Sequence, residues 1–129
     1  MPLYTISTQK GVLSPAEKVM LAKDVTDFHC ETTGLDRAYV KIVFDTFSAG
    51  EGFVGGEPAA AAILTVLIRG GRSVEYKAAM LQKLWAMLQR ATRATDTEIL
   101  VAIQEAPASN AMELGVIMPD LDAAAARSS

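Results

Sequence analysis

The feature that most constrains this chain is an internal repeat in which the two copies are offset by 59 residues. The aligned pairs share their chemistry or their hydrophobicity, and they are Lys10 with Arg69, Ser14 with Ser73, Leu21 with Met80, Val25 with Leu84, Phe28 with Met87 and Ile42 with Val101. The repeated hydrophobic pattern is better evidence than the few identities. The sequence therefore predicts one unit present twice, at about residues 2–46 and 61–104.

The first copy has the pattern strand, helix, strand. Leu3–Thr8 is short and carries β-branched and aromatic residues, which is typical of a strand. Ser14-Pro15-Ala16-Glu17 predicts a helix start, because the serine can cap the helix, proline suits the first turn and the glutamate completes a capping box. Leu21, Val25 and Phe28 would then share a helical face, and Gly34 can end the helix. Tyr39–Phe44 alternates and predicts a second strand.

The second copy repeats this order. Ile63–Ile68 is a nearly continuous apolar run, which is typical of a central strand. Gly70-Gly71 interrupts it, and Ser73 is the candidate cap of a helix whose apolar stripe comprises Met80, Leu81, Leu84, Met87 and Leu88. Ile99–Ile103 predicts the last strand. The segment 48–58 has four glycines and indicates a loop, and the chain after Pro107 is predicted to be irregular.

These units predict an α/β (α+β) fold. A helix between two strands supplies the crossover that parallel strands need, so each copy should pair its strands in parallel. We expect one domain over residues 1–119, with a four-stranded sheet, two helices on one face and a flexible tail at 120–129. The other face of the sheet would be uncovered, and association of copies would bury it.

The composition excludes several classes of function. A net charge of −3 argues against nucleic acid as a partner. No apolar run reaches the length of a membrane span, and the N-terminus lacks the pattern of a signal peptide. Cys30 and His29 are each the sole residue of their type, so neither a disulfide within the chain nor a cysteine- or histidine-based metal site is expected. We therefore expect a cytoplasmic protein without a membrane partner, a metal or another cofactor.

Four segments could carry chemistry. Pro2 follows the initiator methionine directly at the start of a strand. Ile68-Arg69-Gly70-Gly71-Arg72-Ser73 places two guanidinium groups at a strand-to-helix turn, where they could bind a carboxylate in bidentate fashion. His29 lies on the first predicted helix. Glu113 follows Pro107 in Glu105-Ala106-Pro107 and precedes Leu114-Gly115.

Together these segments resemble the tautomerase superfamily, and most closely its cis-3-chloroacrylic acid dehalogenase group. The resemblance covers about residues 2–119. It implies that Met1 is removed and that the secondary amine of Pro2 acts as an acid or base, with His29 and Glu113 as further catalytic residues. It implies that Arg69 and Arg72 bind the carboxylate of a small substrate, and that Glu113 activates water, with help from His29. It also implies a homotrimer that needs no cofactor.

One position departs from that group, and it leaves the reaction open. The group's tyrosine on the last strand would align with Ala102. The leading interpretation is hydration, with hydrolytic dehalogenation of an unsaturated acid to malonate semialdehyde. The alternatives are a 2-oxo-acid keto–enol tautomerase, a decarboxylase of malonate semialdehyde, and a non-catalytic oligomeric protein that retains the fold, the last favoured if Met1 stays in place.

Overall fold

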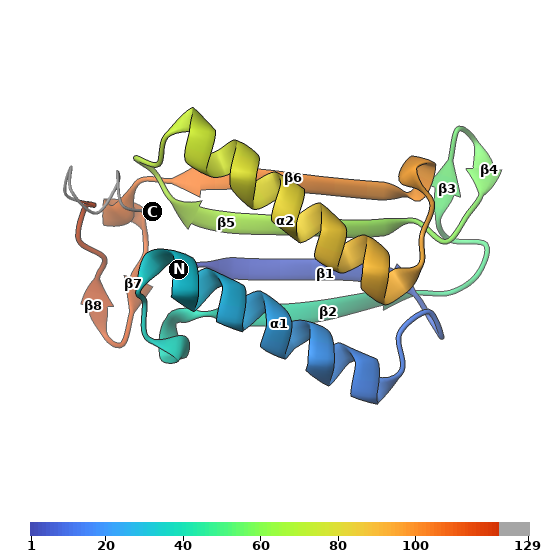
Figure 1. Ribbon diagram of the computed structural model, residues 1–129, viewed down its shortest axis with the longest axis horizontal. Helices are drawn as coiled ribbons and strands as arrows, with labels where there is room; N and C mark the ends of the chain where they lie inside the picture. The colour runs from blue at the N-terminus through green and yellow to red at the C-terminus, as the bar shows by residue number, and fades with distance from the viewer. Residues whose placement is uncertain (122–129) are drawn as a thin grey trace.

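The fold is that of a computed structural model, which describes residues 1–121. Four long strands and two long helices alternate along the chain (Figure 1): β1 (Leu3–Gln9), α1 (Pro15–Thr33), β2 (Lys41–Phe47), β5 (Ala62–Arg69), α2 (Val74–Thr92) and β6 (Ile99–Ala106). The shorter elements are η1 (Arg37–Tyr39), β3 (Phe53–Val54), β4 (Glu57–Pro58), η2 (Asp96–Glu98), η3 (Ala108–Asn110), β7 (Met112–Glu113) and β8 (Val116–Ile117). Of the predicted tail, residues 122–129 lie outside the described part of the chain.

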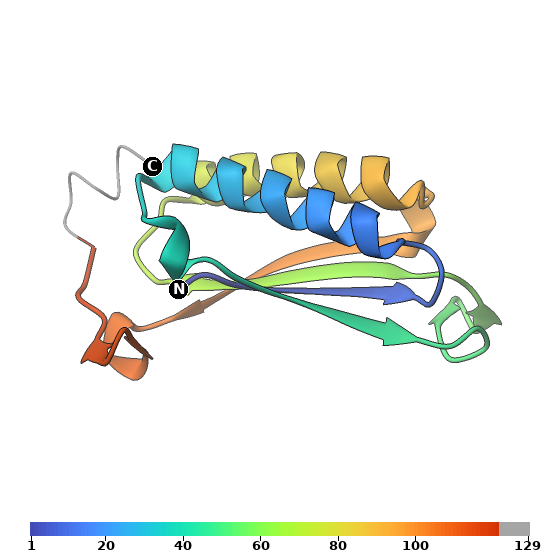
Figure 2. The ribbon, with the colours of Figure 1, turned by 90° about the horizontal axis from the view of Figure 1, so that it is seen from below.

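The long strands form a mixed sheet in the order β2-β1-β5-β6. The pairs β1–β2 and β5–β6 are parallel, and the two copies of the unit join through the antiparallel pair β1–β5. Both helices cover the same face of the sheet (Figure 2). The predicted parallel pairing within each unit, the four strands and the one-sided helical layer are all confirmed.

The two copies agree closely in their helices. The bounds of α1 and α2, and of η1 and η2, differ by the 59 residues of the repeat. The first strands of the two copies depart from this offset by one residue. Tyr4 and Ile6 of β1 are buried under the helices, and the corresponding buried residues of β5, Leu64 and Val66, lie 60 positions later instead of 59. A shift of one residue in a strand reverses which face a side chain lies on.

Local signals at the helix ends explain why these segments are helical. The Ser14 hydroxyl accepts from the backbone N–H of Glu17 at 3.1 Å, and the Glu17 carboxylate accepts from the N–H of Ser14 at 2.9 Å. Ser73 accepts from the N–H of Tyr76 at 3.0 Å. Gly34 ends α1 with φ of 74°, a conformation that glycine adopts without strain. The predicted starts of both helices and the predicted end of α1 are confirmed.

The core lies between the helices and the sheet. It contains Tyr4, Ile6, Leu64 and Val66 from the central strands, and the helices add Leu21, Val25, Met80, Leu84 and Leu88. The predicted face of α1 is confirmed for Leu21 and Val25, and Phe28 packs at the edge of the core. The next buried position of the helix is His29, four residues after Val25, because side chains four apart lie on one face.

Two segments predicted to be irregular contain small hairpins. In the segment 48–58, β3 pairs with β4 across a turn at Gly55-Gly56. After Pro107, β7 pairs with β8 across a turn at Leu114-Gly115. The predictions of a loop at 48–58 and of an irregular chain after Pro107 missed these hairpins, because strands of two residues are too short to show a hydrophobic period.

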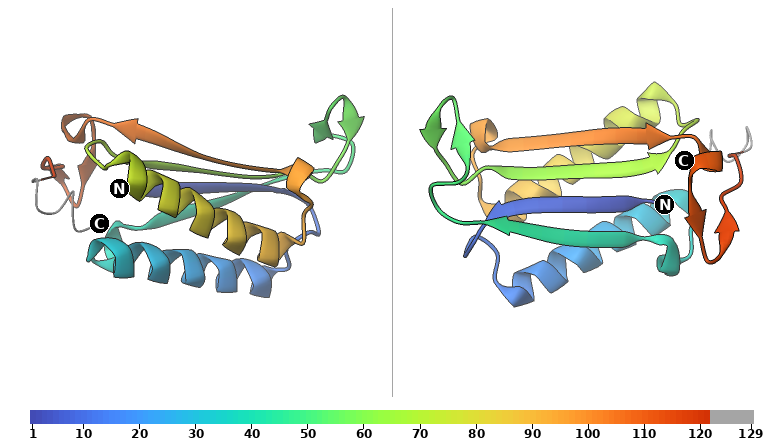
Figure 3. Two further views of the ribbon diagram at one scale, coloured as in Figure 1. Left: turned by 45° about the horizontal axis from the view of Figure 1, so that its top comes forward. Right: turned by 180° about the vertical axis from the view of Figure 1, so that it is seen from behind.

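No helix covers the other face of the sheet (Figure 3, right), and apolar side chains are exposed there. Leu3, Val43 and Leu100 are 37%, 49% and 55% exposed. In the described part of the chain, neither helix has the length and apolar character needed to cross a membrane.

Candidate functional site

Pro2 is fully buried at the start of β1, and its carbonyl accepts from the backbone N–H of Lys41 at 3.2 Å. Met1 precedes it and is also buried. In the full chain the nitrogen of Pro2 is therefore part of an amide, and the free amine belongs to Met1. Removal of Met1 would transfer the chain's terminal amine to the proline ring.

A pocket at this end of the sheet brings together three of the predicted site residues. His29, Arg69 and Arg72 line it, with Met1, Leu35, Ile68 and Tyr76. Its volume is about 10 Å³, which is no more than one water molecule requires. A pocket of this volume has no room for an organic acid, and Met1 is one of the residues in its wall.

The two arginines reach the pocket from the end of β5 and the turn that follows. Arg69 Nη1 donates to the carbonyl of Pro119 at 2.7 Å. The guanidinium carbon of Arg72 lies 4.8 Å from the ring centre of Tyr76, within the range of a cation–π contact. Burial lowers the pKa of Arg72 below its usual value. A partly desolvated guanidinium interacts more strongly with an anion than one in bulk water does.

His29 is buried on α1, and its Nδ1 lies 2.8 Å from the hydroxyl of Tyr4. The two rings meet edge to face, with centroids 5.7 Å apart. Burial, together with the positive charges of Arg72 and the N-terminus, lowers the pKa of His29 to about 4. His29 is therefore uncharged at neutral pH. Burial also raises the pKa of Tyr4 far above its usual value, so its phenol stays protonated.

Glu113 reaches the N-terminus through the β7–β8 hairpin. Leu114 and Gly115 have φ of 54° and 79°, and positive φ at both central residues is the mark of a type I′ turn. The predicted motif Glu113-Leu114-Gly115 is thus the hairpin turn itself. One oxygen of the buried Glu113 carboxylate forms an ion pair with the Met1 ammonium, and the other lies 2.5 Å from Lys41 Nζ.

Lys41 is a residue of this site that the sequence reasoning missed. It is the first residue of β2 and lies opposite Leu3 in the parallel pair, which places it beside the N-terminus. Burial, Lys41 and Arg69 lower the pKa of the Met1 ammonium to about 6, whereas the neighbouring Glu113 carboxylate favours the charged form. The only sequence signal was a charged residue within the apolar segment 39–44.

Ala102 does not supply the hydroxyl that the resemblance leads one to expect. It lies on β6 opposite Thr65 of β5. The chain has three tyrosines, and Tyr76 is the one that lines the pocket. Tyr4 is bonded to His29, and Tyr39 lies in η1. Neither lines the pocket.

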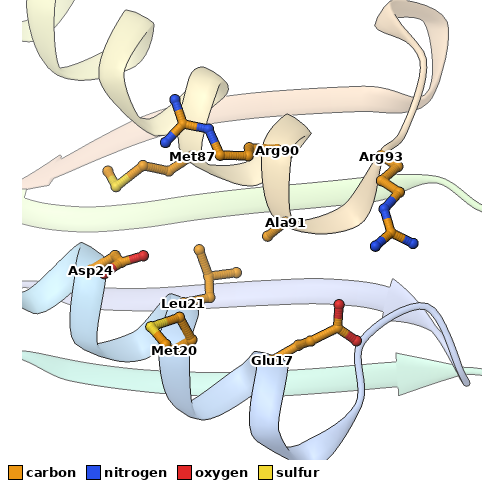
Figure 4. A pocket seen from close by; sticks show the side chains of 8 residues that line it. All are labelled: Glu17, Met20, Leu21, Asp24, Met87, Arg90, Ala91 and Arg93. Atoms are coloured by element: carbon orange, nitrogen blue, oxygen red, sulfur yellow. The ribbon is translucent and has the colours of Figure 1, made fainter.

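A larger cavity of about 230 Å³ lies between the two helices and contains none of the predicted site residues (Figure 4). Its walls combine methionines with acidic groups of α1 and basic groups at the end of α2. Glu17 and Arg93 face each other across it (Figure 4). Within residues 1–121, no three His, Cys, Asp or Glu side chains are grouped in a way that could hold a metal ion.

Comparison with known proteins agrees with this architecture. A family model described as "Putative oxalocrotonate tautomerase enzyme" matches residues 1–128. No protein of curated function matches the chain. The crystal structure of native Ps01740 is 34% identical, with a TM-score of 0.82, and the match covers 86% of this chain and 99% of that one.

Two further structures share the fold. A fused 4-OT symmetric trimer is 26% identical, with a TM-score of 0.79 over 89% of this chain and 94% of that one. N1, a member of the cis-3-chloroacrylic acid dehalogenase family, is 22% identical, with a TM-score of 0.84 over 92% of this chain and 84% of that one. The family model matches nearly the whole chain, and the fold is shared. This chain therefore belongs to the oxalocrotonate tautomerase family of the tautomerase superfamily.

Proposed function

We propose that the chain is a cofactor-independent acid–base enzyme that interconverts the keto and enol forms of a small 2-oxo acid, with Pro2 as the base after Met1 is removed. The observation that supports this is the terminal amine, here that of Met1, whose pKa is lowered to about 6 by burial and by Lys41 and Arg69. An amine with such a pKa is mostly uncharged at neutral pH, as a base must be. Removal of Met1 would also clear the pocket that Met1 lines.

The residues around the amine have matching roles in this proposal. Arg69 and Arg72 bind the carboxylate of the acid. The amine of Pro2 takes a proton from the carbon next to the carbonyl group. The electron pair of the broken C–H bond forms the C=C bond of the enolate, and the π pair of the carbonyl group moves to its oxygen. Cations and N–H donors stabilise the negative oxygen until it is protonated, and the reverse reaction uses the same groups. We also propose that the chain is located in the cytoplasm.

The assay measures ketonisation of phenylenolpyruvate. It uses a preparation of the chain in which mass spectrometry has confirmed the loss of Met1. We expect turnover to be lower by about 10²-fold or more in chain that keeps Met1, the loss typical of removing a catalytic base, and to fall also in Pro2→Ala, which replaces the secondary amine with a primary one. Pro15→Ala is the matched control, because Pro15 lies at the first turn of α1, far from the amine in the fold. Equal activity of processed chain and chain that keeps Met1 would contradict the proposal.

A second candidate is hydration of an unsaturated acid such as cis-3-chloroacrylate, and the buried Glu113 beside the N-terminus favours it. Glu113 would take a proton from water as the oxygen bonds to the β-carbon. Protonated Pro2 would give a proton to the α-carbon, and the halohydrin would then lose hydrogen halide to give malonate semialdehyde. Tautomerisation ranks first because both Glu113 oxygens face cations and Ala102 carries no hydroxyl.

Glu113→Gln separates the two reactions. It should leave ketonisation nearly unchanged, whereas it should abolish any turnover of 3-chloroacrylate. Glu105→Gln is the control, because Glu105 pairs with Lys77 at 2.6 Å much as Glu113 pairs with Lys41. Turnover of cis-3-chloroacrylate that depends on Glu113, without ketonisation, would establish hydration instead.

A further inference from the structure

Tyr4 and His29 form a buried pair behind the pocket. Tyr4 has no exposed surface, and its hydroxyl lies 2.8 Å from Nδ1 of His29. His29 lines the pocket and Tyr4 does not. Tyr4 therefore cannot touch a bound acid, and any influence it has on the reaction must pass through the imidazole.

The direction of this hydrogen bond follows from the needs of the buried phenol. Among the described residues, His29 Nδ1 is the one hydrogen-bond partner of the Tyr4 hydroxyl. If Nδ1 carried the proton and donated it, the phenolic hydrogen would be buried without an acceptor, at a cost of about 1–3 kcal/mol. Donation by the phenol avoids this cost, so Nδ1 is the acceptor. The phenol is protonated and the imidazole uncharged at neutral pH, as this arrangement requires.

A neutral imidazole carries one ring proton, and with Nδ1 accepting, that proton is on Nε2. We infer that Tyr4 is a positioning residue, which holds His29 in the Nε2–H form and makes it a hydrogen-bond donor to the anionic oxygen of the bound acid. This inference rests on the proposed function only for the identity of the acid. It departs from the sequence-based hypothesis in which His29 helps Glu113 to take a proton from water, because a ring nitrogen that already carries a proton cannot accept another.

Burial and two nearby positive charges keep the imidazole uncharged. Arg72 approaches from the turn before α2 and the N-terminal amine from the start of β1, and both oppose a positive charge on His29. Tyr4 approaches from β1 and donates a hydrogen bond to the ring. A neutral donor beside two guanidinium groups would bind an anion without adding a third full charge to the pocket.

Nuclear magnetic resonance can test this directly, because His29 is the single histidine of the chain. We would record two- and three-bond ¹H–¹⁵N correlations of the ring in untagged, ¹⁵N-labelled full chain at pH 7. The expected result is an Nε2 shift typical of a protonated nitrogen and an Nδ1 shift typical of an unprotonated one. A protonated Nδ1, or a ring with both nitrogens protonated, would overturn the inference whether or not the chain turns over any acid.

Tyr4→Phe tests the part played by the hydroxyl. It keeps the ring packing, and we expect the two nitrogen shifts to move toward the averaged values of a tautomer mixture. Tyr39→Phe is the matched control and should leave both shifts unchanged, because the Tyr39 hydroxyl makes no hydrogen bond to another described residue. Shifts in Tyr4→Phe identical to those of the wild type would refute the positioning role. If Tyr4→Phe does not fold, the wild-type spectrum still decides the tautomer.

Kinetics of two His29 variants tests the donor role, using the ketonisation assay. Glutamine retains an N–H donor at a similar reach but cannot act as a base. Alanine provides neither a donor nor a base. We expect His29→Gln to keep at least tenfold more of kcat/KM than His29→Ala. If the wild type is active and the two variants lose equal activity, the reaction does not depend on a hydrogen bond donated by the side chain of residue 29. Absence of turnover in the wild type would count against the proposed function and leave the spectroscopic result standing.

Discussion

Lys41 acts on the N-terminal amine from a neighbouring strand. Its ammonium and that of the N-terminus share the Glu113 carboxylate, one at each oxygen. Lys41 and Arg69 each repel a positive charge on the amine and so lower its pKa, in addition to the larger effect of burial. The same groups would surround the amine of Pro2 in a chain without Met1, which links this local electrostatics to the proposed base.

This predicts the sign of the pH dependence. In the enolisation direction, where the uncharged amine takes the proton from carbon, kcat/KM for phenylpyruvate should be low at acid pH, rise as pH increases through the pKa of the amine, and level off above it. We expect a midpoint below the 7.7–8.0 that is usual for a terminal amine. A proton donor, as hydration requires, would give the opposite trend, with activity lost as pH rises.

Lys41→Gln should move that midpoint to higher pH, because the charged amine is then repelled by one cation fewer. The measurement is the pH profile of kcat/KM, or direct titration of the amine by nuclear magnetic resonance. Lys77→Gln removes a lysine with a similar ion pair elsewhere, and we expect it to leave the midpoint unchanged. A midpoint that moves downward in Lys41→Gln would be inconsistent with the assigned electrostatics.

At the scale of elements, the β7–β8 hairpin decides where Glu113 lies. It is a small unit of two-residue strands, closed at its base by a hydrogen bond of 2.9 Å from the N–H of Met118 to the carbonyl of Ala111. Its turn needs positive φ at two successive residues, and one of these, Leu114, is not a glycine. The left-handed conformation costs such a residue about 1–2 kcal/mol, so the hairpin tolerates little further strain.

Gly115→Val should therefore loosen the hairpin without unfolding the domain. A β-branched residue at φ of 79° adds strain of about 1–2 kcal/mol or more to a unit with few contacts. Hydrogen exchange should become faster at the amide of Met118, while the amides of the central strands stay protected. Gly55→Val strains the equivalent turn between β3 and β4 and should not affect Met118. Unchanged exchange at Met118 in Gly115→Val would show that the turn does not hold the hairpin.

At the scale of the whole molecule, the uncovered face of the sheet implies association. The helices bury one face, and the opposite face exposes Leu3, Val43 and Leu100 across three of the four strands. An apolar face of this kind is typical of an interface. We propose a homotrimer that uses this face, and the fused 4-OT that shares the fold is described as a symmetric trimer.

Val43→Lys and Leu100→Lys should each shift the chain toward the monomer, because each places a charge within the proposed interface. Light scattering coupled to size-exclusion chromatography measures the mass. Val19→Lys is the control, since Val19 is 71% exposed on α1, on the other side of the molecule, and we expect its mass to match that of the wild type. A wild-type monomer, or variants that keep the oligomer, would refute this interface.

The sequence by itself determined the repeated unit, the parallel pairing within each copy and the helix ends, because these depend on periodicity and on caps formed by residues three apart, such as Ser14 with Glu17. It also indicated Arg69, Arg72 and His29, which the fold brings into one pocket, and Glu113 beside the N-terminus, while their roles stay predictions. Only the tertiary structure decided that Lys41 meets Glu113, 72 residues later in the chain, and that Tyr4 meets His29. These contacts depend on strand register, on a turn with two positive φ angles and on which helical face is buried, and short sequence patterns do not encode distances between elements.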